Sequence, residues 1–396
     1  MWKTFALSTP RDTFRIHPLF IPLMIWIVTA LAFILLLTLL IMIHEWGHYI
    51  TARLFKVDVE EFGFGLPPRA KTMFHRKGTD FTLNWIPFGG FVRLKGENAM
   101  TDVERNAHGS FANAGFVARA SILLAGVFMN FLLALVLLTI GFSVGRWIPS
   151  WYSSMDDLTQ AAVQGELSFQ RGVYIADVLP GSPAAKAGVP KDRILEKIDN
   201  QRIMRAEDVI AFQEKKRSVT YTVRTVKEPI EQEIYRIQLV GGKSGVEISD
   251  YAYDLTAPLR SIPQSLSLSL KETVFMTKQT VVGLKQLVVT LVTRARVPEG
   301  ITGIVGIAVL THGSVESGFM SYLRLVALLS LSLAILNVLP LPALDGGRLL
   351  FVLIEAILRR PLNRRFEVMT NALGFVFLIS LIVVITFNDI AHLFIS

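Results

Sequence analysis

The sequence predicts a polytopic α-helical membrane protein with about four transmembrane helices and a separate strand-rich domain. Hydrophobic residues make up 52% of its 396 residues, and the mean hydropathy of +0.47 is too high for an ordinary soluble protein. The apolar residues are gathered in runs of about 20 residues or more, the length that a helix needs to cross a hydrocarbon core of roughly 30 Å. These runs are Leu19–Ile43, Ile122–Phe142, Met320–Leu341 and Phe366–Phe387.

The basic residues predict the orientation of these spans. The net charge is +8, and much of it lies in the loop after the first span and in the segment after the third. Because cytoplasmic loops are enriched in Lys and Arg, both segments should be cytoplasmic, with the chain ends and Arg146–Gly318 outside the cytoplasm. Nucleic-acid binding would instead call for a basic soluble module. We therefore expect the lipid bilayer, and no nucleic acid, as a partner.

The spans divide the chain into regions of different character. Residues 1–50 hold the N-terminal tail and the first span, 51–145 a cytoplasmic loop and the second span, 165–250 the strand-rich domain, 251–317 an amphipathic helical region, and 318–396 the last two spans. Alternating apolar residues between turns in Gly172–Ile248 predict the strand-rich domain. In Leu270–Leu291, apolar residues recur at spacings of three and four, with lysines beside them. Such a helix could lie on a membrane surface or pack on the preceding domain.

The residues that can carry chemistry are concentrated in HEWGH, His44–His48, at the end of the first apolar run. Two histidines four residues apart on a helix project from one face, so both imidazoles can reach one metal ion. The chain has no cysteine, and zinc accepts nitrogen ligands, with three protein ligands and one open position in a catalytic site. Glu45 can take the proton from a water molecule that attacks a carbonyl. Because ionisable side chains at membrane depth are costly, this motif predicts a catalytic zinc site.

A third ligand must come from elsewhere, and Asp345 is the best candidate. It follows Pro340 and Pro342, which interrupt a helix, and precedes Gly346 and Gly347, which permit unusual backbone angles. Non-helical backbone at membrane depth is tolerated only where it is buried in protein or lines a cavity. An acidic residue in such a break, on the same side as HEWGH, is one that a metal would attract. Taken alone, the segment could also be a simple loop with an exposed aspartate.

HEWGH and the later segment N-x-x-P-x-P-x-L-D-G-G together resemble the site-2 protease family of intramembrane zinc metalloproteases. The closest likeness is to the bacterial branch that includes the regulator of sigma-E protease, and it covers nearly the whole chain. The resemblance implies three zinc ligands, His44, His48 and Asp345. It also implies that Glu45 is the general base and that Asn337 helps to hold the substrate strand.

Other segments extend the likeness. Gly63-Phe64-Gly65 resembles the family's G-F-G loop, Gly126-x-x-x-Asn130 resembles its G-x-x-x-N element, and Ile86–Leu94 resembles its membrane-associated β-hairpin, expected here on the cytoplasmic side with its turn at Gly89-Gly90. An exposed strand edge near the zinc could pair with an unwound substrate. The hairpin could instead merely cap the helix bundle.

The strand-rich domain has a likeness of its own. Gly172–Ile175, Val178–Gly188 and Asp192–Asp199, in this order, resemble a bacterial PDZ domain, an α+β fold expected here outside the cytoplasm. In PDZ domains the position of Gly172, Val173 and Tyr174 corresponds to the carboxylate-binding loop, whose amides can hold a peptide end. This domain could bind peptides or act as a steric gate over the active site.

The chain departs from the family at Gly126-Val127 and Gly303-Ile304, where the family often has Gly-Pro. Close relatives of the sigma-E regulator also often have two PDZ domains, and this chain has room for one. Neither departure touches a catalytic position.

The sequence therefore predicts a multi-pass zinc metalloendopeptidase of the bacterial inner membrane, with Zn²⁺ near the cytoplasmic face. Its substrates would be single-span membrane proteins, such as anti-sigma factors, or remnant signal peptides, cut in regulated intramembrane proteolysis. An upstream site-1 protease would be a partner if substrates must first be trimmed. Two alternatives are a non-enzymatic PDZ scaffold, which predicts a degraded metal motif, and a metal transporter, which predicts more polar residues along the other spans.

Overall fold

The computed structural model describes residues 20–97, 99, 101–226, 230–294, 296–298 and 300–395. The chain forms two compact units, one containing the residues up to Gly141 and from Ser269 onward, and the other Phe142–Leu268. Among the described residues, four helices are long and apolar enough to cross a membrane: Met24–Leu54, Phe116–Ser143, Phe319–Val338 and Arg365–Ala391. The prediction of a multi-pass membrane protein with about four spans is confirmed.

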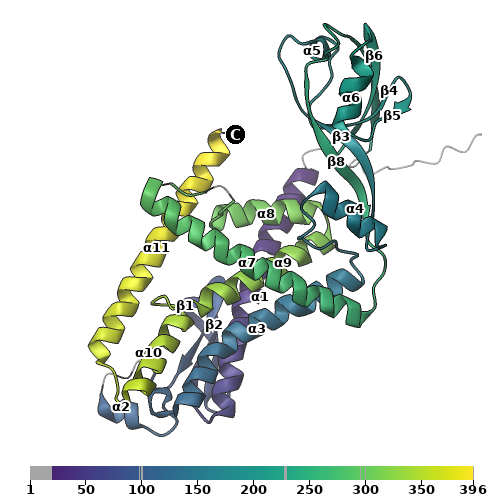
Figure 1. Ribbon diagram of the computed structural model, residues 1–396. Helices are drawn as coiled ribbons and strands as arrows, with labels where there is room; N and C mark the ends of the chain where they lie inside the picture. Colours follow the sequence, from purple (N-terminus) through teal and green to yellow (C-terminus); the bar gives the residue numbers. More distant parts are fainter. Residues whose placement is uncertain are drawn as a thin grey trace, which may run out of the picture. The chain divides into compact units, whose positions relative to one another are not determined.

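The first unit contains these four helices and a pair of long strands (Figure 1). Its elements are α1 (Phe20–Leu54), β1 (Val59–Arg76), β2 (Thr79–Leu94), α2 (Asp102–Asn106), the 3₁₀ helix η1 (Phe111–Asn113), α3 (Phe116–Ser143), α7 (Ile262–Arg294), α8 (Ile304–Glu316), α9 (Phe319–Val338), α10 (Asp345–Leu358) and α11 (Arg364–Ile395). The boundary between the units falls within α3, after Gly141, and within α7, before Ser269.

The helix boundaries follow backbone breaks more closely than they follow apolarity. The first apolar run stops at Ile43, but α1 continues through HEWGH and ends at Leu54, just before Lys56 takes a left-handed backbone with φ of 59°. The two histidines therefore lie inside a continuous helix, which satisfies their backbone groups internally. The interruption predicted at Pro340 and Pro342 separates α9 from α10.

The strand pair corrects the predicted hairpin. The turn is at Lys77-Gly78, where both residues have positive φ (51° and 82°), as two-residue hairpin turns often require. Gly89 and Gly90 do not form a turn but lie within β2. They are small for a different reason, because an added Cβ at Gly90 would lie 2.4 Å from Met42 Sδ of α1. The predicted turn was wrong because close helix packing and a tight turn both select glycine.

The strand β2 curls over β1. Phe62 in β1 pairs with Phe81 on one side and with Val92 on the other, so both parts of β2 flank it. The segment Phe91–Leu94 is thereby brought back along β1, next to α1.

The second unit is an antiparallel sheet with short helices. Its elements are α4 (Met155–Val163), β3 (Ser168–Val178), α5 (Pro183–Lys186), β4 (Arg193–Ile198), β5 (Gln201–Arg202), α6 (Ala206–Gln213), β6 (Ser218–Thr225), β7 (Gln232–Gln238) and β8 (Val246–Thr256). The strand order is β7-β6-β4-β3-β8, with β5 beside β4. Its core is a cluster that includes Val173, Leu195 and Tyr221, all fully buried. The expected strand-rich region is therefore present.

The predicted carboxylate-binding loop is not available in this sheet. Gly172–Tyr174 lies inside β3, where Val173 pairs with Leu195 of β4 and with Asp250 of β8. Both edges of β3 are covered there, so a peptide end could not add, and that prediction is wrong. The edge strand beside β3 is β8, which follows a glycine-rich turn at Gly241–Gly245. Sequence order did not reveal this because β8 comes from the far end of the domain.

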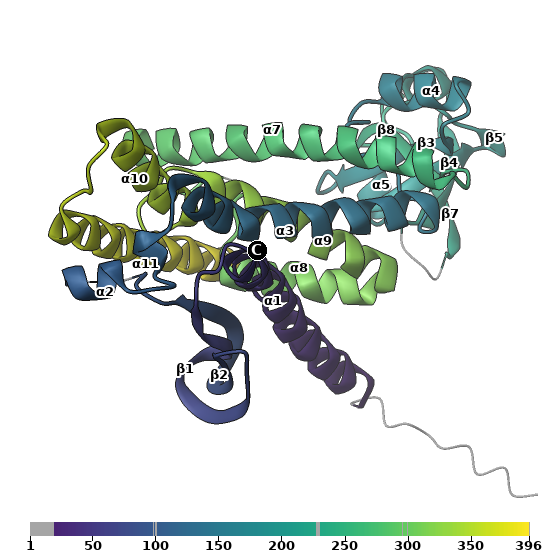
Figure 2. The ribbon, with the colours of Figure 1, turned by 90° about the horizontal axis from the view of Figure 1, so that it is seen from below.

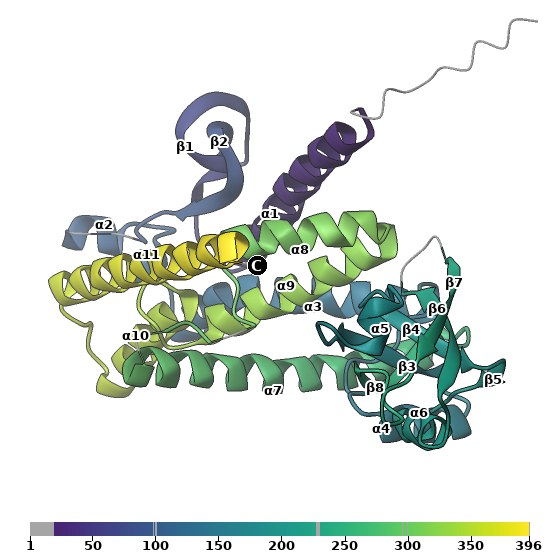
Figure 3. The same cartoon turned by 90° about the horizontal axis from the view of Figure 1, so that it is seen from above.

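The amphipathic helix α7 contacts α3 and α9 through its polar face. In Figures 2 and 3 it runs beside α3 and α9. Ser269 Oγ accepts a hydrogen bond of 3.1 Å from Thr139 of α3, and fully buried Glu272 lies 3.9 Å from Arg324 of α9. The predicted apolar stripe stays outward, with Val288 60% exposed. The stripe therefore does not pack the helix on the bundle.

Helix α11 is fixed to α8 near its C-terminal end (Figure 3). Buried Asp389 accepts hydrogen bonds of 2.9 Å from the backbone N–H groups of Gly303 and Gly306. A carboxylate suits this position because the first N–H groups of a helix have no partner within it and carry a partial positive charge.

Candidate metal centre

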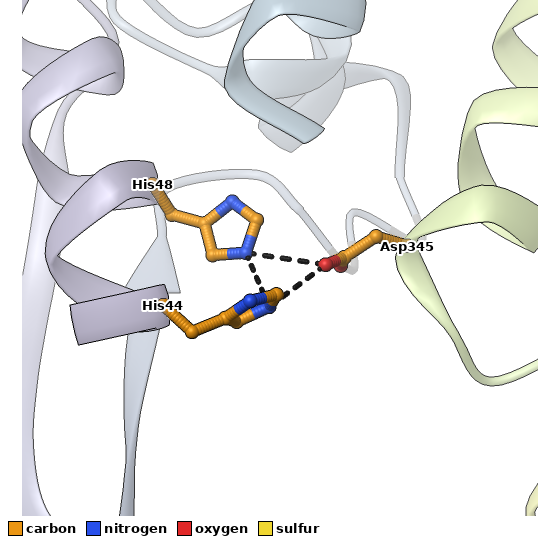
Figure 4. A group of neighbouring side chains, drawn as sticks. All are labelled: His44, His48 and Asp345. Carbon is orange, nitrogen blue, oxygen red and sulfur yellow. Dashed lines mark hydrogen bonds and ion pairs between the residues drawn. The ribbon is translucent and has the colours of Figure 1, made fainter. Parts of the chain in front are cut away.

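The HEWGH motif presents two imidazoles on one face of α1. His44 and His48 are one helical turn apart, and both are buried, with 7% and 8% of their surface exposed. Their Nε2 atoms lie 3.1 Å apart. The i, i+4 spacing thus produces the convergence that the sequence predicts (Figure 4).

Asp345 approaches the two imidazoles from a distant part of the sequence. It is the first residue of α10, directly after the interruption that follows α9. Its Oδ2 lies 2.9 Å from His44 Nε2 and 3.3 Å from His48 Nε2 (Figure 4). Residues about 300 positions apart in the sequence are thereby joined in one group. A carboxylate is also favoured at a helix N-terminus.

The distances fit a metal ion. Ligand atoms about 2.0–2.1 Å from one tetrahedral zinc lie about 3.3 Å from each other. The separations of 2.9, 3.1 and 3.3 Å among His44, His48 and Asp345 are close to that value. Two imidazole nitrogens and one carboxylate oxygen are a donor set that zinc accepts in catalytic sites. These residues therefore fit the ion.

The helix α3 supports the two imidazoles from behind. His48 Nδ1 is 2.7 Å from the carbonyl oxygen of Ile122, so Nδ1–H donates there and Nε2 keeps its lone pair. The amide of fully buried Asn130 lies 3.4 Å from His44 Nδ1, and its Oδ1 has no partner among the described residues. Rotating this amide by half a turn would give Nδ1–H an acceptor. Gly126 is required for this approach, because an added Cβ would lie 2.5 Å from His48 Nε2.

Glu45 faces the same space as the three ligands. It lines a cavity of about 350 Å³ together with His44, His48 and Asp345. Its Oε2 accepts a hydrogen bond of 3.0 Å from the backbone N–H of Val92 in β2. The returning part of β2 thus borders the cavity and holds the carboxylate at its wall.

Arg348 and Glu97 form a charged pair at the cavity wall that sequence reasoning missed. They are in direct contact, and both also line a second cavity of about 140 Å³. Burial by itself would lower the pKa of the Arg348 guanidinium. The neighbouring carboxylates, of which Glu97 contributes most, outweigh burial and raise that pKa above its usual range. Arg348 therefore stays charged. Its position three residues after Asp345, one turn along α10, was the signal that could have identified it.

The other predicted site residues are not among those that line the cavity beside His44, His48 and Asp345. Asn337 is half-buried in the last turn of α9. Gly63, Phe64 and Gly65 lie within β1, where Gly63 and Gly65 are buried. Gly89 and Gly90 pack on α1. Their assignment to substrate binding stays a prediction.

Comparison with known proteins gives a consistent result across the chain. The model of "Peptidase family M50" matches residues 32–381. A protein of Clostridium perfringens is 29% identical over 363 residues, covering 89% of this chain and 95% of the relative. A protein of Agrobacterium fabrum is 29% identical over 381 residues, covering 91% and 95%, and one of Fusobacterium nucleatum is 28% identical over 382 residues, covering 92% and 99%. Each of the three carries the name "putative zinc metalloprotease".

Proposed function

Because the chain belongs to peptidase family M50, the site-2 protease family, and is a zinc metalloprotease, we propose that it hydrolyses peptide bonds in or near transmembrane segments of other membrane proteins. One observation carries the proposal. His44, His48 and Asp345 converge within the unit that contains the four membrane helices, and Glu45 lines the same cavity.

The residues divide the chemistry between them. His44, His48 and Asp345 would hold the zinc, and Glu45 would accept the proton from the attacking water. A zinc ion with three protein ligands polarises a carbonyl and makes water acidic enough to react near neutral pH. The hydrogen bond from His48 Nδ1 to Ile122 keeps the imidazole in the tautomer that this task needs.

The edge of β2 supports substrate binding by strand addition. Val92 and Leu94 direct their N–H groups away from β1, to the carboxylates of Glu45 and Glu97 at 3.0 and 3.3 Å. An incoming extended segment would take over these donors, as peptides do at exposed strand edges. The same event would release Glu45 toward water and place the substrate backbone beside the metal. A helical substrate must unwind first, because its carbonyls are tied up in its own hydrogen bonds.

The orientation and surroundings are part of the proposal. By the positive-inside rule, the basic loops support a metal centre near the cytoplasmic face of a bacterial inner membrane, with the second unit outside the cytoplasm. We assign the second unit as a PDZ-like domain from its three matching segments and its antiparallel sheet. Substrates would be single-span proteins or remnant signal peptides in regulated intramembrane proteolysis, with an upstream site-1 protease where trimming comes first.

Two substitutions test the assignment. Glu45→Gln should keep the zinc but lose cleavage about 10²–10⁴-fold, because an amide cannot accept the proton. Asp345→Ala should lose bound zinc as well as activity, because it removes one of three ligands. Metal content and cleavage of a model transmembrane substrate would be measured on the purified full-length protein. Wild-type cleavage by Glu45→Gln, or one tightly held zinc in Asp345→Ala, would overturn the corresponding assignment.

A further inference from the structure

The loop that delivers Asp345 to the metal centre has an unusual backbone. Residues 339–344 leave α9 and enter α10 without regular structure. Within it Ala343 has φ of 72°, in the left-handed region that non-glycine residues rarely adopt. Such a conformation is unfavourable and persists only where the surroundings hold it. Something must therefore hold the backbone two residues before Asp345.

The holding group comes from α11. The side-chain Oδ1 of Asn371 accepts a hydrogen bond of 3.2 Å from the backbone N–H of Ala343. One turn further along α11, Gly374 lies against the neighbouring Pro342, so closely that an added Cβ would be 2.4 Å from Pro342 Cβ and 2.7 Å from its carbonyl oxygen. One helix thus binds this loop by a hydrogen bond and by close backbone packing.

Asn371 is a polar residue in a membrane helix, and its position there needs a physical explanation. It is a half-buried amide within Arg365–Ala391, a candidate membrane span, where polar side chains are costly unless they have a partner. Its partner is a backbone N–H outside any regular helix, which would otherwise lose a hydrogen bond. The hydrogen bond therefore satisfies both groups and fixes Ala343 at the same time.

We propose that Asn371 is a positioning residue for Asp345, acting through Ala343 to set where the third carboxylate stands relative to His44 and His48. This rests on the proposed role of Asp345 as a zinc ligand. Asp345 stands at the first residue of α10, directly after the loop, whereas the two histidines lie inside the continuous helix α1. The backbone position of Asp345 therefore depends on how the loop is held, and α11 contacts that loop.

The expected effect follows from the hydrogen bond. Partners that hold a ligand directly are worth about 10–100-fold in metal affinity. Because Asn371 acts two residues away from the ligand, the effect should lie at or below the low end of that range, and Asn371→Ala should release zinc about five- to tenfold faster. Asn371→Asp keeps an acceptor oxygen at the same place and should restore slow release. Ser380→Ala is the matched control on α11, because this exposed hydroxyl bonds only its own helix, at Val376 O, among the described contacts.

The test uses full-length protein purified with zinc in detergent. Zinc release to a chelator would be followed over time, and the visible spectrum of the cobalt-substituted protein would report the coordination geometry. We expect faster release and a changed cobalt spectrum for Asn371→Ala, with both near wild type for Asn371→Asp and Ser380→Ala. Wild-type behaviour of Asn371→Ala would overturn the inference. So would equal losses in Asn371→Ala and Asn371→Asp, or in Asn371→Ala and Ser380→Ala.

A parallel variant separates this inference from the proposed function. If Asp345→Ala retains zinc with wild-type release, the ligand assignment itself fails. If Asp345→Ala loses zinc but Asn371→Ala does not, only the positioning role fails. Gly374→Ala provides a second route, because it should push the loop away without removing a polar group and so reproduce the faster release. Normal release from folded Gly374→Ala would count against support by α11.

Discussion

Replacing Gly126 with alanine should weaken zinc binding while leaving α3 helical. The added Cβ would lie 2.5 Å from His48 Nε2 and 2.8 Å from His44 Nε2, the two nitrogens that face Asp345. An ordinary contact begins at 3.4 Å, so His48 Nε2 would have to retreat from 2.5 to 3.4 Å, by about 0.9 Å. Metal–ligand distances are held within about 0.2 Å. The required shift is several times larger.

The fall in zinc affinity should reach about 100-fold, the upper end of the range for disturbed metal-site partners. Loss of folding is not the expected cause, since alanine in a helix interior is more stabilising than glycine by about 0.5–1 kcal/mol. Zinc affinity would be measured by chelator competition on the full-length protein, together with cleavage of a transmembrane substrate. Gly313→Ala is the control, because in helix α8 an added methyl meets nothing within 4 Å. Unchanged zinc affinity in Gly126→Ala would refute the close approach of α3.

Three further predictions concern the parts around the site. Asp389→Ala removes the acceptor of two N–H groups at the start of α8, so the free energy of unfolding should fall by about 1–2 kcal/mol. Burial works to raise the pKa of the Glu355 carboxyl, but the ion pairs with Arg119 and Arg105 hold that pKa below its usual range. Wild type should therefore be more stable than Glu355→Gln, and this difference in the free energy of unfolding should have its largest value above the ordinary Glu pKa of about 4.3. The difference should shrink as pH falls through the lowered pKa of Glu355. Replacing Ser168–Thr256 by a short linker should let the enzyme cut substrates that keep a folded extracytoplasmic part, if the second unit acts as a gate.

The measurements for these three are separate. Thermal unfolding at neutral pH tests Asp389→Ala, with Asp389→Asn as the milder comparison, and an unchanged midpoint would contradict the cap. If the stability difference between wild type and Glu355→Gln grew as the pH falls, a lowered pKa of Glu355 would be contradicted. The deletion is practical because Ser168 and Thr256 are paired across β3 and β8, with their hydroxyl oxygens 2.7 Å apart. If the deleted protein cut trimmed substrate normally and still refused intact substrate, the gate would be contradicted.

The sequence by itself determined what depends on local spacing and composition. Four apolar runs indicated four membrane helices, because the length needed to cross a bilayer is a property of each segment alone. HEWGH placed two histidines on one face because a helix repeats every 3.6 residues. The prolines before Asp345 indicated the interruption between α9 and α10, because proline lacks the N–H that a helix needs. Each of these is decided by residues close together in the chain.

The tertiary structure decided what depends on neighbours far apart in the chain. Periodicity could not show that α11 supports the loop through Asn371, or that α3 approaches the histidines at Gly126, since both contacts join separate helices. Glycine was ambiguous for the same reason: Gly78 forms a turn, whereas Gly90 makes room for Met42. The peptide-binding assignment of Gly172 failed because strand order depends on long-range pairing, and β8 covers the edge that the sequence left open.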